Sequence, residues 1–438
     1  EYSPIHAFFG NLVTVFMKKK CKNVLNVLLM AMSAMFCACI TEPEEKIKTL
    51  YPDNGLRFRL YPNDLAKNDS ASANLAHGLV FLAHPNASYE LSFDGDSSMG
   101  KPPTLQLFRV KPMPSDESHV NLTKVKNVSA KEIDGRIVYR FVCEKSVSEN
   151  WALTLVQDGS YYEGPTNNVR LKGEGAYSDH MSLNLIVVGN VASRLSGFTI
   201  DDLARDLLDS YRKFYTSIQI DTLYVNYANL HPTLGSKYPA DEPWYAGWSS
   251  NDKLVSELGG WPGIVNALDI VLVDYIIDED VLGYSYLFSG NMGGGYGSTV
   301  ALGAFVKKSD GVYPLEKKEI VETAIHETGH FFGLRHTSST RTDIGEGGDL
   351  SNREDGFEDT PYCPEIWLNS MAKRRSDLNI DDFVMPRIKI ATSVLSFDYR
   401  KCMDADNIMF PYDMYGEYSG FSELQLAALR ATLMIYPH

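Results

Sequence analysis

The sequence lacks a surplus of positive charge and any long apolar run. Acidic residues outnumber basic ones by 56 to 41, and the net charge of −15 argues against nucleic acid as a partner. The apolar run from Val24 to Phe36 is too short for a stable membrane span. Internal repeats are also lacking in the first half, so a repeat array is not expected there. With 44% hydrophobic residues, a chain of 438 residues can form two domains, each with its own core.

The N-terminal region resembles a bacterial lipoprotein export signal. Lysines follow Met17, an apolar run comes next, and Phe36-Cys37-Ala38-Cys39 is similar to a lipoprotein cleavage site with Cys39 as the lipidated residue. We therefore expect a protein of the bacterial cell envelope, lipid-anchored to the outer membrane. Exposure on the cell surface is a further hypothesis, and an uncleaved membrane anchor is the alternative.

The expected organisation has five parts. Residues 1–16 are interpreted as translated sequence upstream of the true start and 17–38 as the signal peptide. Residues 39–46 are polar and acidic, as suits a tether. A β-rich domain is expected over 47–178 and a catalytic domain over 179–438.

The β-rich region has short apolar segments separated by turns that are rich in Asp, Gly, Asn and Pro. Such spacing predicts an antiparallel, sandwich-like domain. No constellation of reactive residues occurs in it, so its role as support, substrate-docking module or pro-segment stays open. The segments are Arg57–Leu60, Leu79–Leu82, Tyr89–Phe93, Leu105–Val110, Ile137–Val142 and Leu153–Val156.

From Met181 strands and helices alternate, which is typical of an α/β or α+β domain with a twisted mixed sheet. Strands are predicted at Leu183–Val188, Thr222–Tyr227 and Leu268–Val273, with an amphipathic helix over Thr199–Ile218 between the first two. Ser422 and Gln425 match a capping box that opens a closing helix.

The most informative segment is His326-Glu327-Thr328-Gly329-His330-Phe331-Phe332-Gly333-Leu334-Arg335-His336. Histidines four residues apart project from one face of a helix and can bind the same ion. Gly333 can adopt the left-handed conformation that ends a helix, so that His336 returns as a third ligand. Three protein ligands and one open position are typical of a catalytic zinc site. Apolar residues at helical spacing between Leu315 and Leu334 favour the helix.

The carboxylate of Glu327 fits the role of general base. Zinc polarises a carbonyl group and lowers the pKa of water toward neutrality. Glu327 would accept a proton from the attacking water and pass it to the leaving amine, without being a ligand itself. The sequence thus predicts a zinc-dependent endopeptidase that acts on a protein or peptide substrate.

The eleven-residue motif resembles that of the metzincin zinc peptidases, whose second mark is a methionine in a tight turn beneath the metal. The segment Asp406–Tyr412, with Met409, resembles this Met-turn. Thr337 and the segment Asp355–Pro361 are similar to the pappalysin-like branch of that family. Some members have a tyrosine two positions after the methionine; here that position is Pro411, so Tyr412 is left out of the catalytic set.

The resemblance also implies a substrate held in extended form against an edge strand of the catalytic sheet. Ser298–Phe305 is the candidate edge. The glycine-rich loop Gly290–Gly297 before it opens a strand and lacks the lysine of a phosphate-binding loop, so we interpret it as a flexible rim of the cleft.

The acidic segment after His336 has oxygen donors dense enough for calcium, which pappalysin-like enzymes bind near this region. The candidate ligands are Asp349, Asp355 and Asp359, and a merely solvated acidic loop is the alternative.

Cysteine positions suggest one disulfide beside the active site. Cys363 follows the Asp-Thr-Pro segment and Cys402 precedes the Met-turn, so a bridge between them would brace two loops, whereas two reduced thiols are the alternative. Cys143 is interpreted as a buried strand cysteine rather than a pro-segment thiol that caps the zinc.

Two other functions remain compatible with these residues. A surface binding or adhesion lipoprotein could keep a non-catalytic zinc site, and a hydrolase could act on a non-peptide amide.

Overall fold

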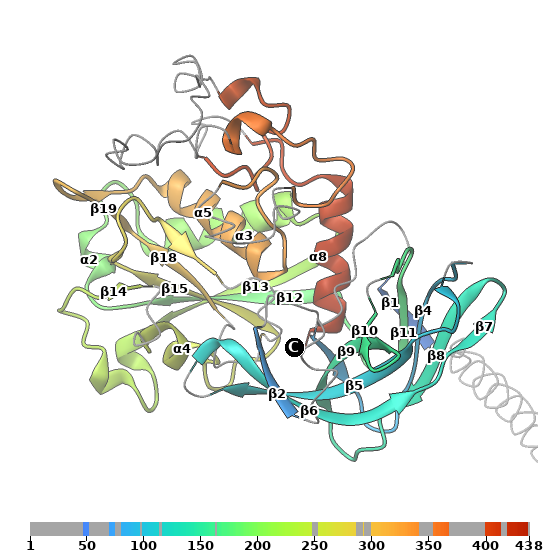
Figure 1. The fold of residues 1–438 in the computed structure, drawn as a ribbon. Coiled ribbons are helices and arrows are strands. Elements are labelled where there is room, and N and C mark those ends of the chain that lie inside the picture. The colour runs from blue at the N-terminus through green and yellow to red at the C-terminus, as the bar shows by residue number, and fades with distance from the viewer. Residues whose placement is uncertain are drawn as a thin grey trace, which may run out of the picture. The chain divides into compact units, whose positions relative to one another are not determined.

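The computed structural model describes residues 47–51, 70–74, 80–96, 99–113, 116–162, 164–247, 253–285, 292, 299–340, 354–367, 399–412 and 418–436 (Figure 1). The chain divides into two compact units, Glu1–Lys48 and Thr49–His438. The predicted leader, the lipidated Cys39 and the tether lie outside the described residues. Among the helices that the structure describes, none has the length and apolar character that crossing a membrane requires.

The first half of the second unit forms two sheets. One has the order β1-β11-β4-β8-β7, and the other has the order β10-β9-β5-β6-β2, with β3 also paired to β9. The pairs β4–β8, β5–β6 and β5–β9 are antiparallel. The strands are β1 (Ile47–Tyr51), β2 (Ser70–Asn74), β3 (Val80–Ala83), β4 (Ser88–Asp94), β5 (Thr104–Met113), β6 (Asp116–Val128), β7 (Lys131–Ile133), β8 (Arg136–Val142), β9 (Glu149–Gln157), β10 (Ser160–Tyr161) and β11 (Arg170–Glu174).

Side chains from both of these sheets share one core. Tyr89 of β4 lies 6.4 Å, ring centre to ring centre, from Trp151 of β9. Leu91 and Leu155 are also fully buried in this core. The antiparallel strand arrangement agrees with the prediction, while the domain boundaries and the role of this region stay predictions. Strand β6 was not predicted, and the predicted strand Arg57–Leu60 lies outside the described residues.

The second half contains a five-stranded mixed sheet of order β13-β12-β15-β18-β17. Neighbouring strands are parallel except that β17 runs antiparallel to β18. The strands are β12 (His180–Val187), β13 (Gln219–Tyr227), β15 (Ala267–Val273), β17 (Gly283–Tyr284) and β18 (Thr299–Gly303). Helices α3 (Ile200–Phe214) and α5 (Lys317–Phe331) pack with alternate sheet residues such as Leu185. Helix α4 (Leu254–Leu258) packs with the other set, such as Ile186, on the opposite face (Figure 1).

The predicted edge strand was wrong. Strand β18 pairs with β15 on one side and with β17 on the other, so it is internal, and β17 is the edge of the sheet. All five residues of β18 are buried. Such an unbroken buried segment is typical of a strand covered on both faces, rather than of an edge.

Helix α5 is shorter at both ends than the apolar pattern suggested. Pro314 ends strand β20 (Gly311–Pro314), and the helix begins after Glu316, which forms a capping box with Glu319. Helix α8 (Glu423–Ile435) begins at the predicted capping box of Ser422 and Gln425, which is confirmed. The remaining elements are α2 (Val191–Arg194), β14 (Tyr245–Ala246), β16 (Tyr275–Ile276), β19 (Phe305–Lys308), β20 (Gly311–Pro314) and the short 3-10 helices η4 (Ala228–Leu230), η5 (Gly235–Lys237) and η8 (Tyr399–Lys401).

Candidate metal centre

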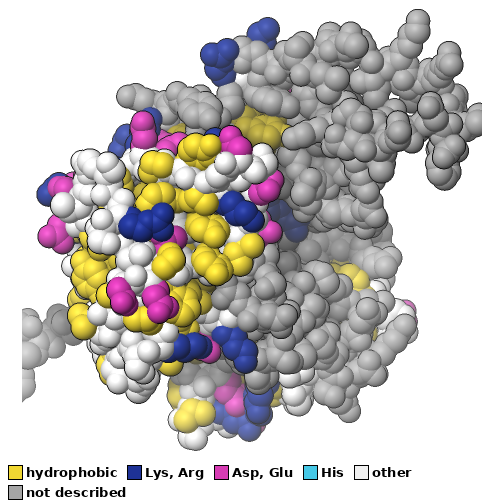
Figure 2. Space-filling view, turned by 90° about the vertical axis from the view of Figure 1, so that its left-hand side faces the viewer, with side chains coloured by type: hydrophobic (Ala, Val, Ile, Leu, Met, Phe, Trp, Pro, Cys, Tyr) yellow, Lys and Arg dark blue, Asp and Glu magenta, His cyan; other side chains and the backbone are white. Residues whose placement is uncertain are grey.

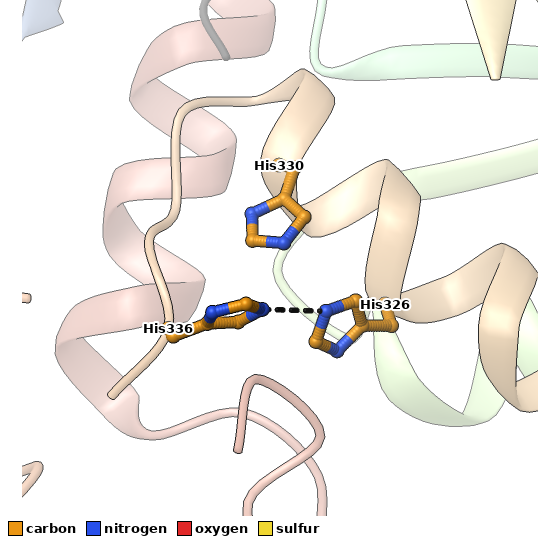
Figure 3. A group of neighbouring side chains, drawn as sticks. All are labelled: His326, His330 and His336. Atoms are coloured by element: carbon orange, nitrogen blue, oxygen red, sulfur yellow. Dashed lines mark hydrogen bonds between the residues drawn. The ribbon is translucent and has the colours of Figure 1, made fainter. Parts of the chain in front are cut away.

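Three histidine rings converge beside the end of α5. His326 and His330 lie one turn apart on the helix, and the chain returns after the helix to bring His336 against them (Figure 3). Their ring centres are 4.7, 4.8 and 5.2 Å apart. One nitrogen from each ring lies within 4.8 Å of the other two, so the group could hold a metal ion. The rings are partly exposed, which leaves a ligand access to them.

Backbone carbonyls fix the tautomers of two of these rings. The Nδ1 atom of His326 lies 2.7 Å from the carbonyl oxygen of Ile408, and that of His330 lies 2.7 Å from the carbonyl oxygen of Leu334. A carbonyl oxygen only accepts, so each Nδ1 must carry the hydrogen. The Nε2 atom of each neutral ring then keeps its lone pair, as a metal ligand requires.

The spacing of the nitrogens fits a shared ion. The Nε2 atoms of His326 and His336 are 3.2 Å apart. Two nitrogens that each bind a tetrahedral zinc at about 2.0–2.1 Å lie roughly 3.3–3.4 Å from one another. Because Nε2 of His326 has no hydrogen, the contact is a hydrogen bond only if His336 carries its hydrogen on Nε2. The residues present therefore suit a metal ion that imidazole binds.

Gly333 allows the return of the chain. Its φ angle is 90°, in the region that favours glycine, and its N–H donates to the carbonyl oxygen of His330 at 2.8 Å. Leu334 N–H donates to the carbonyl oxygen of Gly329 at 2.9 Å. These bonds end the helix and direct the next residues back toward His326.

Glu327 lies next to the first histidine and close to the edge of the sheet. Its carboxylate accepts a hydrogen bond from the backbone N–H of Ser285, the residue that follows β17. Burial raises the pKa of Glu327 to about 8, and the Ser285 bond acts in the opposite direction. A cation held by the histidines would also lower this pKa, because nearby positive charge favours the carboxylate.

The turn that contains Met409 packs beneath the histidines. Met409 is fully buried, and a Cβ placed on Gly329 would overlap its Sδ atom. Its carbonyl oxygen accepts from the N–H of Thr337 at 3.1 Å, directly after the third histidine. Together with the Ile408 carbonyl that holds His326, this turn contacts both the helix and the returning chain.

Two tyrosines that were not predicted from the sequence bond to carbonyl groups of α5. Tyr215 Oη donates to the carbonyl oxygen of Ile325 at 2.6 Å. Tyr211 Oη lies 3.1 Å from the carbonyl oxygen of Ala324 and 2.7 Å from Thr328 Oγ1. Their rings are stacked and buried, with Tyr211 on α3 and Tyr215 directly after it. The signal available in the sequence was a pair of tyrosines four residues apart on the apolar face of that helix.

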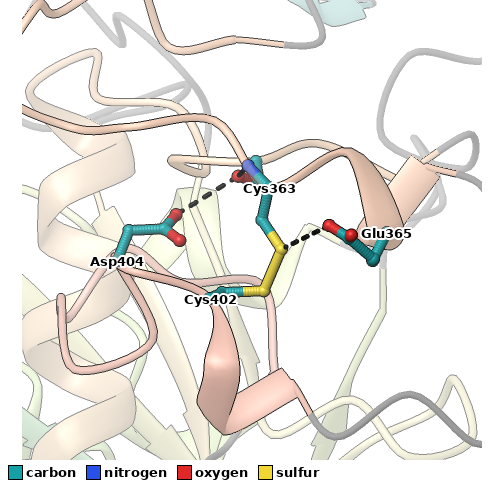
Figure 4. The surroundings of a disulfide bond; sticks show 5 residues. Cys363, Glu365, Cys402 and Asp404 are labelled. Carbon is teal, nitrogen blue, oxygen red and sulfur yellow. Dashed lines mark hydrogen bonds between the residues drawn. A yellow bond between two sulfur atoms is a disulfide. The ribbon is translucent and has the colours of Figure 1, made fainter.

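The predicted disulfide is present. Cys363 and Cys402 are bonded and link segments 39 residues apart (Figure 4). The N–H of Cys363 donates to Ser338 Oγ at 2.8 Å, and Ser338 Oγ donates to Asp404 at 3.2 Å. The disulfide therefore braces the chain just after His336 as well as the approach to the Met409 turn.

The candidate calcium ligands have protein partners where they are described. Asp355 is buried and accepts from Thr360 Oγ1 at 2.7 Å and from the N–H of Phe357 at 3.0 Å. Asp359 is exposed and accepts from the Leu424 N–H at 2.9 Å, at the start of α8. Asp349 lies outside the described residues. Calcium binding stays a prediction. An ion bound to Asp355 or Asp359 would have to displace hydrogen bonds to these carboxylates.

Cys143 is a free, buried cysteine. Its N–H donates to the carbonyl oxygen of Ala87 at 3.0 Å, and burial raises the pKa of its thiol. A thiol that is buried and held protonated suits the strand-cysteine interpretation better than a metal cap.

Comparison with known proteins gives weak structural similarities and no sequence match. No protein-family model matches the sequence, and no curated protein matches it. Among solved structures, metalloproteinase-II from Bacteroides fragilis is a weak neighbour, with 13% identity, 64% of this chain and 96% of that chain covered, and a TM-score of 0.21. An acetyl xylan esterase from the rumen bacterium Butyrivibrio proteoclasticus has 10% identity, coverage of 65% and 74%, and a TM-score of 0.14. TM-scores this low do not establish a shared fold.

Proposed function

We propose that this protein is a zinc-dependent endopeptidase of the metzincin type. The observation that carries the proposal is the ligand geometry: His326 and His330 have Nδ1 bonded to backbone carbonyls, so the Nε2 lone pair of each neutral ring can bind the ion. Nε2 of His336 lies 3.2 Å from that of His326. Outer partners of this kind are usual for histidines that bind metals.

Zinc at this position would polarise the scissile carbonyl group and lower the pKa of a water molecule. The chain's own residues supply the proton transfer. Glu327 is not needed as a ligand, and as the residue next to His326 it can accept the proton of the attacking water and hand it to the leaving amine. The Ser285 N–H that bonds to its carboxylate would hold Glu327 in place.

The extended substrate would lie along β17, the edge strand. Its residue Gly283 has no side chain, and a Cβ there would meet the carbonyl oxygen of Ala301 and the Cγ2 atom of Thr323, both 2.8 Å away. A glycine therefore lets this short strand pack closely against β18 and α5. Backbone groups of the edge, rather than side chains, would bind the peptide.

The finer assignments rest on the sequence. We place the protein in the pappalysin-like branch because of Thr337 and the Asp355–Pro361 segment, and at the bacterial outer membrane because of the predicted lipid on Cys39.

Among the described residues on the face drawn in Figure 2, basic and acidic side chains are interspersed with apolar ones rather than forming an area of one sign. This face therefore lacks the basic area that nucleic acid would bind.

The test is digestion of a mixed peptide library by protein beginning at Ile40, with zinc measured in the same sample. Glu327→Gln should retain zinc and lose nearly all cleavage, since the amide cannot accept the proton. Removal of zinc with a chelator should abolish cleavage, and added zinc should restore it.

Two outcomes would contradict the proposal. Full activity of zinc-loaded Glu327→Gln would remove Glu327 from the mechanism. Stoichiometric zinc without cleavage of any peptide would favour a binding or adhesion lipoprotein with a non-catalytic zinc site.

A further inference from the structure

A chain of buried polar side chains connects the acidic loop to the Met409 turn. Asp355, Asn407 and Gln425 come from three separate segments and are each at most 8% exposed. Asn407 Nδ2 donates to Gln425 Oε1 at 2.9 Å, and Gln425 Nε2 donates to Asp355 Oδ2 at 3.3 Å. Buried polar groups need such partners, because an unpaired one costs about 1–3 kcal/mol.

Backbone N–H groups fix the direction of every bond in this chain. Met409 N–H donates to Asn407 Oδ1 at 2.8 Å, so the amide nitrogen of Asn407 must point toward Gln425. Ser422 N–H donates to Gln425 Oε1 at 2.9 Å, so the amide nitrogen of Gln425 must point toward Asp355. Because a backbone N–H can only donate, neither amide can rotate without leaving two donors face to face.

This series of hydrogen bonds ends at His326, one of the proposed metal ligands. Asn407 and Met409 enclose Ile408, whose carbonyl oxygen lies 2.7 Å from Nδ1 of His326. Asn407 therefore sets the turn that orients the carbonyl, and Gln425 and Asp355 hold Asn407. At its far end Asp355 is held by the Phe357 N–H and the Thr360 hydroxyl group.

We infer that Gln425 is a positioning residue for the metal centre, acting with Asp355 and Asn407 through the Ile408 carbonyl on His326. The inference rests on the proposed zinc site. Asp355 on this view serves as the far end of a hydrogen-bond chain rather than as a calcium ligand. Outer partners of metal-bound histidines typically change metal affinity by about 10–100-fold when they are removed, and a more distant partner belongs at the low end of that range.

The experiment measures the zinc dissociation constant of the full chain by competition with a chelator, together with kcat and KM. The measurement is made above the pKa of Asp355, which burial raises to about 7, so that Gln425→Glu places two carboxylates opposite one another. Asp355→Asn places two amide nitrogens there. Each should weaken zinc binding by about tenfold. In the double variant the new amide nitrogen at position 355 would face the new carboxylate at position 425, so a donor again meets an acceptor. The amide oxygen at position 355 would still accept from the Phe357 N–H, and zinc affinity should return to near the wild-type value.

Ser217→Ala is the matched control. Ser217 Oγ donates to the carbonyl oxygen of Leu426 at 2.7 Å, so its loss also weakens the anchorage of α8, but outside the chain of bonds. Thermal unfolding is measured for all variants. The control should unfold at a lower temperature with unchanged zinc affinity. If Asp355→Asn does not fold, Thr360→Val tests the same end of the chain and should weaken zinc binding in the same direction.

Several results would overturn the inference. Unchanged zinc affinity in the single variants, no recovery in the double variant, or an equal loss in Ser217→Ala would each contradict positioning through Gln425. Added calcium that raises the zinc affinity of the wild type but not that of Asp355→Asn would instead make Asp355 a calcium ligand. Failure of the wild type to bind zinc at all would instead contradict the proposed function, so the two failures are distinguishable.

Discussion

Met409 occupies the space that a side chain at position 329 would need. The Sδ atom of this fully buried methionine lies closer than van der Waals contact to the position of a Cβ built on Gly329, in the turn of helix between Glu327 and His330. The glycine between His326 and His330 and the methionine of the turn, which lie far apart in the sequence, are thus a packing pair.

Gly329→Ala should destabilise the protein by about 1–3 kcal/mol, because it forces Met409 to move in a close-packed core. Without this overlap, alanine would stabilise the helix by roughly 1 kcal/mol relative to glycine. A loss of stability therefore identifies the overlap with Met409. Urea denaturation of the zinc-free protein measures it. In a Met409→Ala background the same substitution should be neutral or stabilising; an equal cost in both backgrounds would place the strain elsewhere.

Tyr215→Phe should lower the free energy of unfolding by about 1 kcal/mol, since it removes one buried hydrogen bond to the Ile325 carbonyl and leaves the ring in place. Tyr224, which is 43% exposed on β13, supplies the control Tyr224→Phe, and its stability should not change. The comparison uses chemical denaturation at fixed pH. Equal stability of Tyr215→Phe and wild type would mean that the helix is not held from this side.

Replacement of Cys363 and Cys402 by alanine should cost roughly 4 kcal/mol, from the entropy of the closed loop in the unfolded chain. A reducing agent should lower the melting temperature of the wild type and leave that of the double variant unchanged. The variant should also lose activity before it unfolds, because the bridge braces the chain after His336 through Ser338. A reductant effect of equal size in both proteins would point to another disulfide.

Asp269 should make stability fall as the pH rises from about 4 to about 6. Burial in the central sheet raises its pKa to about 6 from the usual 3.8, against the opposing hydrogen bonds from Gly260 and Asn184. A folded-state pKa above the unfolded one means that the folded state binds the proton more tightly, so this contribution is complete below about pH 4 and is lost through about pH 6. The difference amounts to about 3 kcal/mol at most.

Comparison of the wild type with Asp269→Asn isolates this group. The variant cannot ionise at position 269, so the part of the pH dependence between about pH 4 and 6 that Asp269 causes should disappear from its unfolding free energy. Parallel curves for the two proteins would assign the slope to other buried carboxyl groups, such as Asp355, whose pKa burial raises to about 7.

The sequence by itself determined the local features of the site. The spacing of His326 and His330 requires only a helix, and Gly333 only its end, because both depend on residues a few positions apart. The capping box of Ser422 and Gln425 followed for the same reason. Strands with clear apolar patterns, such as β4 and β15, could also be predicted within a few residues.

The tertiary structure decided whatever depends on contacts between distant segments. Strand β18 was predicted to be the edge, but β17 pairs with it and is the edge instead. Because β17 is only two residues long, its sequence pattern is too weak to predict a strand. The bond between Asp355 and Gln425 exists because folding brings α8 to the acidic loop. The carbonyl groups that orient the histidines left no trace in the sequence, because every residue has a carbonyl and only folding selects which ones face a ring.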